Sequence, residues 1–278
     1  MVRADREPYQ GRVVLDERNI IMSSKLDFSK ELIGRRALVT GGSRGIGATI
    51  AQRLIDAGAK VVVAARSRSE ETPAAATLVT GDVRTVDGVK AIATAALSAL
   101  GGLDILVNNA GGSNGFPQGA ASIPEEEWQD VFALNLFSSV RLTNAVLPAL
   151  RESKAAAIVN ISSTAATMGA GAGPFAHYSA AKSGLDVYSR ILAVELAPNN
   201  IRVNVVTPGP VTTVGAEALR RKIGDEMGMP AEAWLQAVPL GRLGGTEDIA
   251  EVVALLVSDR GRWLTGVNYR VDGGMTAR

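Results

Sequence analysis

The sequence of 278 residues contains no cysteine and a single histidine, His177. The absence of cysteine excludes a disulfide framework, a thiol nucleophile and a metal site with cysteine ligands. A histidine-rich metal site is excluded as well, and serine–histidine–aspartate chemistry would depend on His177 alone. We read His177 as a wall residue and not as a base, and we expect no metal.

The charge balance and the hydrophobic pattern exclude further classes. Lysine and arginine number 29 and aspartate and glutamate 28, so the formal net charge of +1 indicates no nucleic-acid or anionic-membrane partner. No apolar run reaches the roughly 18 residues of a membrane helix, so we expect no membrane span. Residues 1–19 are charged throughout, unlike a secretory signal. The expected location is cytoplasmic.

Short apolar segments alternate with helical patterns from residue 33 onwards. This alternation predicts an α/β fold of the Rossmann type, a doubly wound parallel sheet in one domain (33–278), with ligands at the carboxyl ends of the strands. Residues 1–32 are polar and read as an N-terminal extension, and 212–239 as a lid insert. The expected strands are 36–40, 60–65, 78–83, 103–107, 157–161, 202–206 and 267–271. The expected helices are 46–57, 86–100, 125–150 with an interruption near Asn135, 179–196 and 246–256, and the insert at 212–239 is mixed and contains 217–227.

A glycine-rich turn, GGSRGIG at 41–47, lies between the first strand and its helix. Strand, glycine-rich turn, helix and strand within about 30 residues are the context of a dinucleotide-binding fingerprint. The glycines let the backbone approach a pyrophosphate at a helix N-terminus, where N–H groups and the helix dipole favour anions. The spacing is GxxxGxG, and no Gly-Lys-Ser/Thr follows, so the turn is not a P-loop.

The end of the second strand indicates which dinucleotide binds. An acidic residue there would hold the ribose 2′-hydroxyl of NAD, whereas an arginine accommodates a 2′-phosphate. Here Ala65 is followed by Arg66 and Arg68, and Arg44 lies in the glycine-rich turn. Because guanidinium groups suit phosphate, we favour NADP(H), with NAD(H) as the alternative.

The segment YSAAK, Tyr178 to Lys182, opens an apolar-periodic stretch. On a helix, a tyrosine and a lysine four residues apart lie on one face. The pKa of a free tyrosine is about 10, and a nearby cation lowers it towards the range useful for general acid/base catalysis. By itself this pair is a weak signal.

These residues resemble the short-chain dehydrogenase/reductase family, in its compact single-domain branch. The resemblance covers residues 33–276 and rests on eight motifs in the family order. They are TGGSRGIG (40–47), NNAG (108–111), Asn135, ISS (161–163), YSAAK (178–182), PGPVTT (208–213), PLGRLGGTEDIA (239–250) and TGVNYRVDGG (265–274).

The resemblance implies hydride transfer between a nicotinamide cofactor and a ketone or secondary alcohol. It makes Tyr178 the general acid/base, and Lys182 the group that lowers the tyrosine pKa and holds the nicotinamide ribose. Ser163 would bind the substrate oxygen, and Asn135 would hold a water of a proton relay. The same resemblance implies a homotetramer or dimer. It also assigns the cofactor-binding residues: Gly41, Ser43, Arg44, Gly45, Ile46, Gly47, Arg66, Asp82, Val83, Asn109, Ala110, Gly111, Tyr178, Lys182, Pro208, Gly209, Val211 and Thr213.

Two departures from the family pattern stand out. Ser163 and Tyr178 are 15 positions apart, against about 13 in much of the family, so we expect a longer loop at 169–173. The stretch after the second strand is short, which predicts a helix that is cut back and puts the adenine-side contacts in doubt.

The substrate is less determined than the reaction. Met, Phe and Trp residues in 113–116, 164–168 and 214–234 favour an apolar ketone or alcohol. A 3-oxoacyl-(acyl-carrier-protein) reductase is the enzyme alternative; Asn199 stands where many such reductases have a basic residue, although Arg220, Arg221 and Lys222 are nearby. An alternative of another class is a nucleotide-sensing binding protein without turnover.

Overall fold

The structure is a computed structural model that describes residues 28–168, 173–228, 230 and 232–277. Most of the expected N-terminal extension (1–27) and most of the expected longer loop (169–172) therefore lie outside the described residues.

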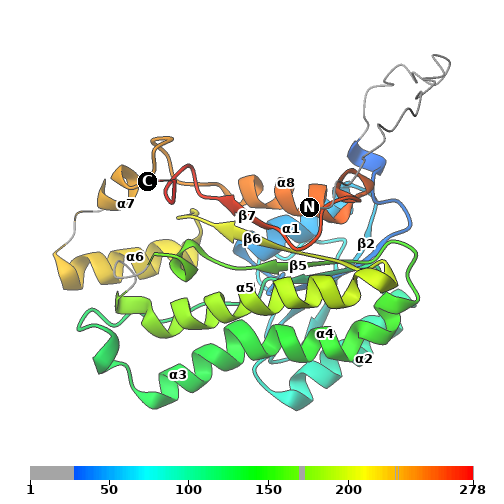
Figure 1. The fold of residues 1–278 in the computed structure, drawn as a ribbon, viewed down its shortest axis with the longest axis horizontal. Coiled ribbons are helices and arrows are strands. Elements are labelled where there is room, and N and C mark those ends of the chain that lie inside the picture. Colours follow the sequence, from blue (N-terminus) through cyan, green and yellow to red (C-terminus); the bar gives the residue numbers. More distant parts are fainter. Residues whose placement is uncertain (1–27, 169–172, 229, 231, 278) are drawn as a thin grey trace, which may run out of the picture.

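Seven parallel strands form one sheet in the order β3-β2-β1-β4-β5-β6-β7, which confirms the doubly wound α/β prediction (Figure 1). Each strand was expected, and most bounds agree within two residues. The strands are β1 (Arg36–Thr40), β2 (Lys60–Ala65), β3 (Thr77–Thr80), β4 (Ile105–Asn108), β5 (Ala157–Ile161), β6 (Arg202–Pro208) and β7 (Asn268–Val271). The order reverses between β1 and β4, so a crevice for a ligand is expected where these two strands end.

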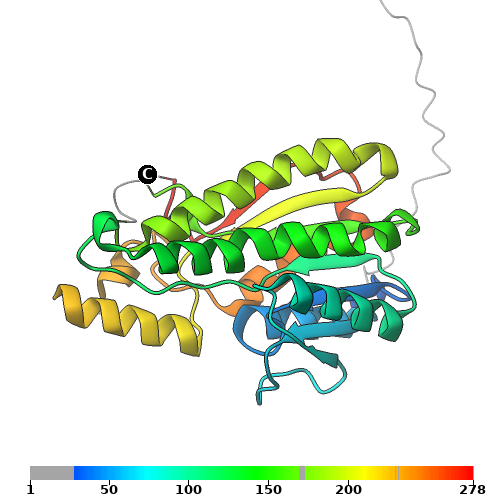
Figure 2. The ribbon, with the colours of Figure 1, turned by 90° about the horizontal axis from the view of Figure 1, so that it is seen from below.

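Helices cover both faces of the sheet. Helices α1 and α8 pack on one face, and α2, α4 and α5 on the other (Figures 1 and 2). The helices are α1 (Gly45–Asp56), α2 (Val86–Leu100), α3 (Glu125–Phe132), α4 (Ser138–Arg151), α5 (Ala176–Leu196), α6 (Val214–Met227), α7 (Glu232–Gln236) and α8 (Thr246–Val257). The expected lid insert thus contains α6 and α7.

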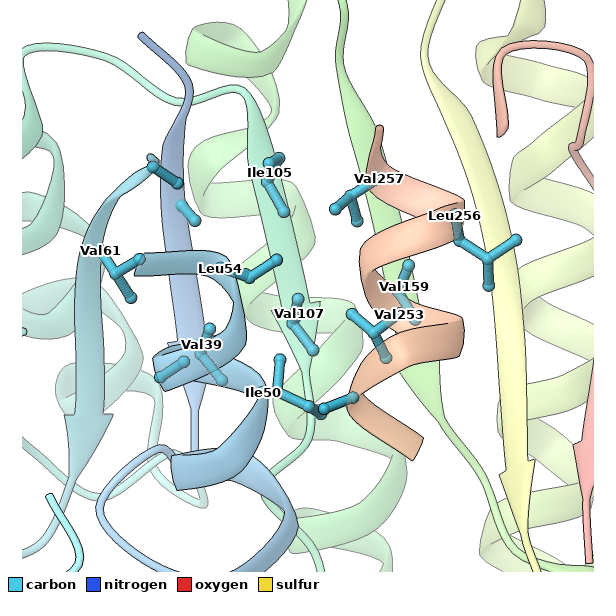
Figure 3. Packing of buried hydrophobic residues seen from close by; sticks show 14 of the residues in the cluster. Val39, Ile50, Leu54, Val61, Ile105, Val107, Val159, Val253, Leu256 and Val257 are labelled. Carbon is cyan, nitrogen blue, oxygen red and sulfur yellow. The ribbon is translucent and has the colours of Figure 1, made fainter. Parts of the chain in front are cut away.

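Aliphatic side chains form the core between α1, α8 and the sheet. Figure 3 shows Ile50 and Leu54 of α1 and Val253 of α8 above Val107 of β4, all of them fully buried. The same core includes Leu32, whose backbone N–H donates to the carbonyl of Ala57 at 2.8 Å. Leu32, the last residue of the expected N-terminal extension, therefore packs into the core.

The expected interruption near Asn135 is a π-helical turn, Ala133–Phe137, between α3 and α4. Such turns insert one residue into a helix and are frequent at functional sites. By length and composition alone, the stretch Glu125–Arg151 is the one candidate membrane span among the described residues, and 39% of its most apolar window is buried. Its inner face packs on the domain through Val131 and Leu142, which are buried.

A buried polar network joins the two central strands to α5. Asn108 Nδ2 of β4 donates to Asn160 Oδ1 of β5 at 2.8 Å, and Asn160 Nδ2 donates to Ser189 Oγ at 2.8 Å. Ser189 Oγ in turn donates to the carbonyl of Leu185 at 2.6 Å. All of these side chains are at most 3% exposed. The network therefore fixes α5 against the strands that carry the polar edge.

We predict that Asn160→Ala lowers the free energy of unfolding by about 2–4 kcal/mol, because Asn108 and Ser189 each lose a partner in the interior. Urea unfolding followed by circular dichroism measures this. Asn199→Ala, at an exposed position, is the matched control and should change the value by less than about 0.5 kcal/mol. Equal stability of the two variants would contradict the role of the network.

Candidate active site

The proposed catalytic side chains gather where β5 ends and α5 begins. Ser163 follows β5 and caps a short helical turn, Thr164–Ala166, by accepting a hydrogen bond from Ala165 N at 3.2 Å. Tyr178 lies in the first turn of α5 and Lys182 one turn later. Strand end and helix start thus bring together residues that are far apart in the chain.

The hydroxyl group of Tyr178 lies near that of Ser163. Burial raises the pKa of Tyr178, and the Ser163 hydroxyl lowers it in part. The expected lowering of this pKa by Lys182 does not appear in the free protein. The reason is geometric, because Lys182 Nζ lies 5.7 Å from the centre of the Tyr178 ring and donates its hydrogen bond elsewhere.

Lys182 is a buried cation. Its side chain is only 3% exposed, and Nζ donates to the carbonyl oxygen of Ile161, the last residue of β5, at 2.7 Å. Burial lowers the pKa of Lys182 from 10.5 to about 8, although the nearby Asp186 carboxylate acts in the opposite direction. The ammonium group is therefore able to release a proton close to neutral pH.

Asn135 connects the π-helical turn to the end of β4. Its Nδ2 donates to the carbonyls of Gly112 at 2.8 Å and Val131 at 2.9 Å, and its Oδ1 accepts from Gly112 N at 3.0 Å. A Cβ atom at Gly111 would lie 2.8 Å from Asn135 Oδ1 and 3.2 Å from Lys182 Nζ. Glycine at this position therefore leaves room for both the Asn135 amide and the Lys182 ammonium. The four predicted catalytic residues form one cluster.

The glycine-rich turn packs against the end of β4. A Cβ atom at Gly47 would lie 2.2 Å from the carbonyl oxygen of Gly41, and Gly41 itself has a φ of 65°. Asn109 Nδ2 donates to the carbonyl of Thr40 at 2.9 Å, and Ala110 N donates to Thr40 Oγ1 at 3.0 Å. The glycine-rich turn thus lies in close contact with the end of β4.

The residues at this end suit an anionic dinucleotide. Gly45 N, at the start of α1, already donates to a carboxylate, Glu71 Oε2, at 2.6 Å. Arg44, Arg66 and Arg68 are exposed, and none of them forms an ion pair with another described residue. A helix N-terminus that binds a carboxylate, with exposed guanidinium groups nearby in the chain, therefore fits the phosphates of a nicotinamide dinucleotide.

Other predicted cofactor residues border the same region. Asp82 pairs with Arg84 at 2.7 Å, which lowers the pKa of Asp82, and Val83 is buried. Thr213 caps α6 by accepting from Ala216 N at 3.1 Å, and a Cβ at Gly45 would meet its methyl group at 3.4 Å. The remaining predicted residues lie in the glycine-rich turn (Ser43, Ile46), at the end of β6 (Pro208) and just after it (Gly209, Val211).

The wall of the site contains His177, which the sequence predicted as a wall residue, and Trp128, which the sequence did not single out. His177 is fully buried, and its Nε2 lies 3.1 Å from Ser113 Oγ. Its ring meets those of Phe116 and Trp128 edge-on, with centroids 5.5 and 5.9 Å apart. Burial lowers the pKa of His177, which fits a neutral wall residue. The sequence did not identify Trp128 of α3, because a position in a helix does not by itself show that the side chain contacts His177.

Known proteins show the same architecture. A family model described as enoyl-(acyl carrier protein) reductase matches residues 41–276. The 3-oxoacyl-(acyl-carrier-protein) reductase FabG of Vibrio cholerae is 39% identical over 252 residues, covering 88% of this chain and 98% of the relative. The FabG of Escherichia coli is 38% identical over 248 residues, covering 87% and 97%.

Solved structures agree. A Burkholderia xenovorans structure described as a short-chain dehydrogenase/reductase has a TM-score of 0.83 and 33% identity, covering 90% of this chain and 99% of its own. Thermoplasma acidophilum aldohexose dehydrogenase has a TM-score of 0.79 and 29% identity, covering 90% and 96%.

The fold, the site and these relatives define an oxidoreductase that acts on a carbonyl or alcohol carbon with a nicotinamide cofactor. The chain belongs to the short-chain dehydrogenase/reductase family.

The lowered pKa of Lys182 predicts a pH dependence of stability. The unfolded chain holds this proton up to a pKa of 10.5 and the folded protein only to about 8. Raising the pH from 7 to 11 therefore removes the cost of the buried charge. The free energy of unfolding of the wild type should rise by about 3 kcal/mol relative to Lys182→Met, which has no such proton.

Chemical unfolding of both proteins across this pH range measures the difference, and groups that titrate in both proteins cancel. Parallel pH profiles would show that Lys182 keeps its ordinary pKa.

Proposed function

We propose that this protein interconverts a ketone and a secondary alcohol with NADP(H), with Tyr178 as the general acid/base. The neighbouring hydroxyl groups of Tyr178 and Ser163, with the buried Lys182 beside Tyr178, support this proposal. In reduction, the Tyr178 hydroxyl gives its proton to the carbonyl oxygen, and the Ser163 hydroxyl donates a hydrogen bond to that oxygen as its charge develops. The bound cofactor supplies the hydride.

Lys182 restores the proton that Tyr178 gives away, and Asn135 positions a water of this relay. With a pKa of about 8, the ammonium of Lys182 exchanges protons near neutral pH, and Asn135 Oδ1 and Lys182 Nζ both lie close to Gly111. Asn135 holds a water that links Lys182 to solvent. Lys182 also holds the nicotinamide ribose, which orients the cofactor towards the substrate carbon.

The predicted cofactor residues bind the dinucleotide along the ends of β1, β2, β4 and β6. The glycine-rich turn takes the pyrophosphate, and Arg44 and Arg66 take the 2′-phosphate of NADP(H). Both guanidinium groups are exposed, and the end of β2 carries no carboxylate to hold a ribose 2′-hydroxyl. NAD(H) is therefore expected to bind more weakly than NADP(H).

A second candidate is reduction of 3-oxoacyl groups on an acyl carrier protein, which the two FabG relatives favour by name. On α6, Arg220 donates inward to the carbonyl of Val211 at 3.1 Å, whereas Arg221 and Lys222 are exposed. Of these three residues, Arg221 and Lys222 are the two that an acidic carrier could contact. A higher kcat/KM for the carrier-bound substrate than for the same acyl chain on a small thioester favours this candidate.

The assembly proposed for this enzyme is a homotetramer, with a dimer as the alternative, in the cytoplasm. Val187, Ile191 and Val194 are exposed on α5, and Trp263 before β7 is 94% exposed. Exposed apolar side chains on a helix and beside an edge strand suit pairing with further copies of the chain. Each subunit is one domain from residue 33, with 212–239 as its lid.

Tyr178→Phe is the test of catalysis against nucleotide sensing. Because phenylalanine has no proton to give, reduction of a ketone should slow by about 100- to 10,000-fold. The dissociation constant for NADPH should stay within about twofold, since the ring remains. Initial rates and a fluorescence titration measure the two quantities. Retained turnover would remove Tyr178 from its role.

Arg66→Ala tests the cofactor preference. Loss of a guanidinium that pairs with the 2′-phosphate should raise the dissociation constant of NADPH about tenfold, which is the usual scale of a charged hydrogen bond. The value for NADH should not change. An equal change for both cofactors would show that Arg66 does not recognise the 2′-phosphate.

A further inference from the structure

The segment between β2 and β3 lies across the glycine-rich turn. We call it the strap (residues 66–76); all of it is described, and none of it is helical. Two hydroxyl groups tie it down, because Ser69 Oγ and Thr72 Oγ1 both donate to the carbonyl oxygen of Ser43, the latter at 3.2 Å. Thr72 is only 7% exposed. The short connection expected from the sequence is thus a fixed cover over part of the cofactor site.

The strap places a carboxylate on a backbone donor of that site. Glu71, between the two anchored positions, accepts the hydrogen bond from Gly45 N at 2.6 Å. Gly45 is the first residue of α1, a helix of 12 residues, whose N-terminus favours negative charge. A dinucleotide phosphate would also bind at the N-terminus of α1. Glu71 and the cofactor therefore compete for one anion position.

The surrounding charges make the competition unequal for the two cofactors. Arg44 adjoins Gly45 in the chain, and Arg66 and Arg68 belong to the strap itself. These cations attract phosphate, whereas the exposed Glu71 repels it. NADP(H) carries one phosphate more than NAD(H), so a negative charge beside these arginines costs NADP(H) more.

We propose that Glu71 is a specificity-determining residue of the cofactor site that acts as a tethered competitor. In the free protein it occupies Gly45 N, and binding of the cofactor displaces it. The charge of Glu71 weakens the binding of NADPH more than that of NADH. It therefore reduces the preference for NADPH over NADH that Arg44 and Arg66 create. This inference rests on the proposed cofactor function.

The test compares Glu71→Gln with the wild type and with Glu70→Gln. Both substitutions remove one negative charge from neighbouring exposed positions, but only Glu71 bonds to Gly45. Fluorescence titration gives the dissociation constants of NADPH and NADH. We expect Glu71→Gln to tighten NADPH about fivefold and NADH about twofold, with a smaller gain at high salt. Glu70→Gln should leave both constants within about 1.5-fold of the wild type. Thermal unfolding of the free variants confirms that each is folded.

Four results would contradict the inference, and one of them would also contradict the proposed function. Equal constants for Glu71→Gln and Glu70→Gln would mean that the contact with Gly45 does not bear on binding. Weaker binding to Glu71→Gln would make Glu71 a ligand of a ribose hydroxyl. If neither the wild type nor a variant binds NADPH or NADH, the proposed function itself fails. If the wild type binds the cofactors and Glu71→Gln changes neither dissociation constant, the inference fails while the proposed function stands.

Discussion

The buried ammonium group of Lys182 is the constraint around which this site is built. A cation in the interior is costly unless polar groups surround it. Here the last carbonyl of β5, that of Ile161, accepts from Nζ at 2.7 Å, which fixes the register of α5 against the sheet. Because Tyr178 lies one turn before Lys182, the same register sets Tyr178 beside Ser163, where β5 ends. The acid/base pair thus depends on how the cation is satisfied.

Backbone dipoles and helix ends organise the rest of the edge. A π-helical turn inserts Asn135 towards the end of β4, where glycine at 111 leaves room for it. On the cofactor side, the N-terminus of α1 is held in the free protein by Glu71. The site therefore combines a buried cation, Lys182, which needs an acceptor, with the N-terminus of α1, which Glu71 already occupies.

The apolar pattern and the order of the motifs predicted the fold well, but they did not predict the pKa of Tyr178 or the contacts of Lys182 and Glu71. Alternating apolar segments predicted all seven strands, because a parallel sheet buried on both faces needs continuous apolar runs. The polar residue at Asn135 marked the break in its helix. Sequence spacing did not reveal that Lys182 points its charge at Ile161, which leaves burial to raise the pKa of Tyr178. The contact of Glu71 with Gly45 was also missed, because a short loop gives no periodicity from which to place its side chains.

The central claim is that this cluster of side chains supports hydride transfer to a carbonyl carbon. Reduction of a simple apolar ketone with NADPH deuterated at C4 of the nicotinamide tests it directly, with mass spectrometry of the alcohol. The account predicts that deuterium from one face of C4 appears on the carbon that bears the new hydroxyl group. Oxidation of the cofactor without deuterium on that carbon, for any ketone or carrier-bound 3-oxoacyl substrate that is turned over, would contradict it.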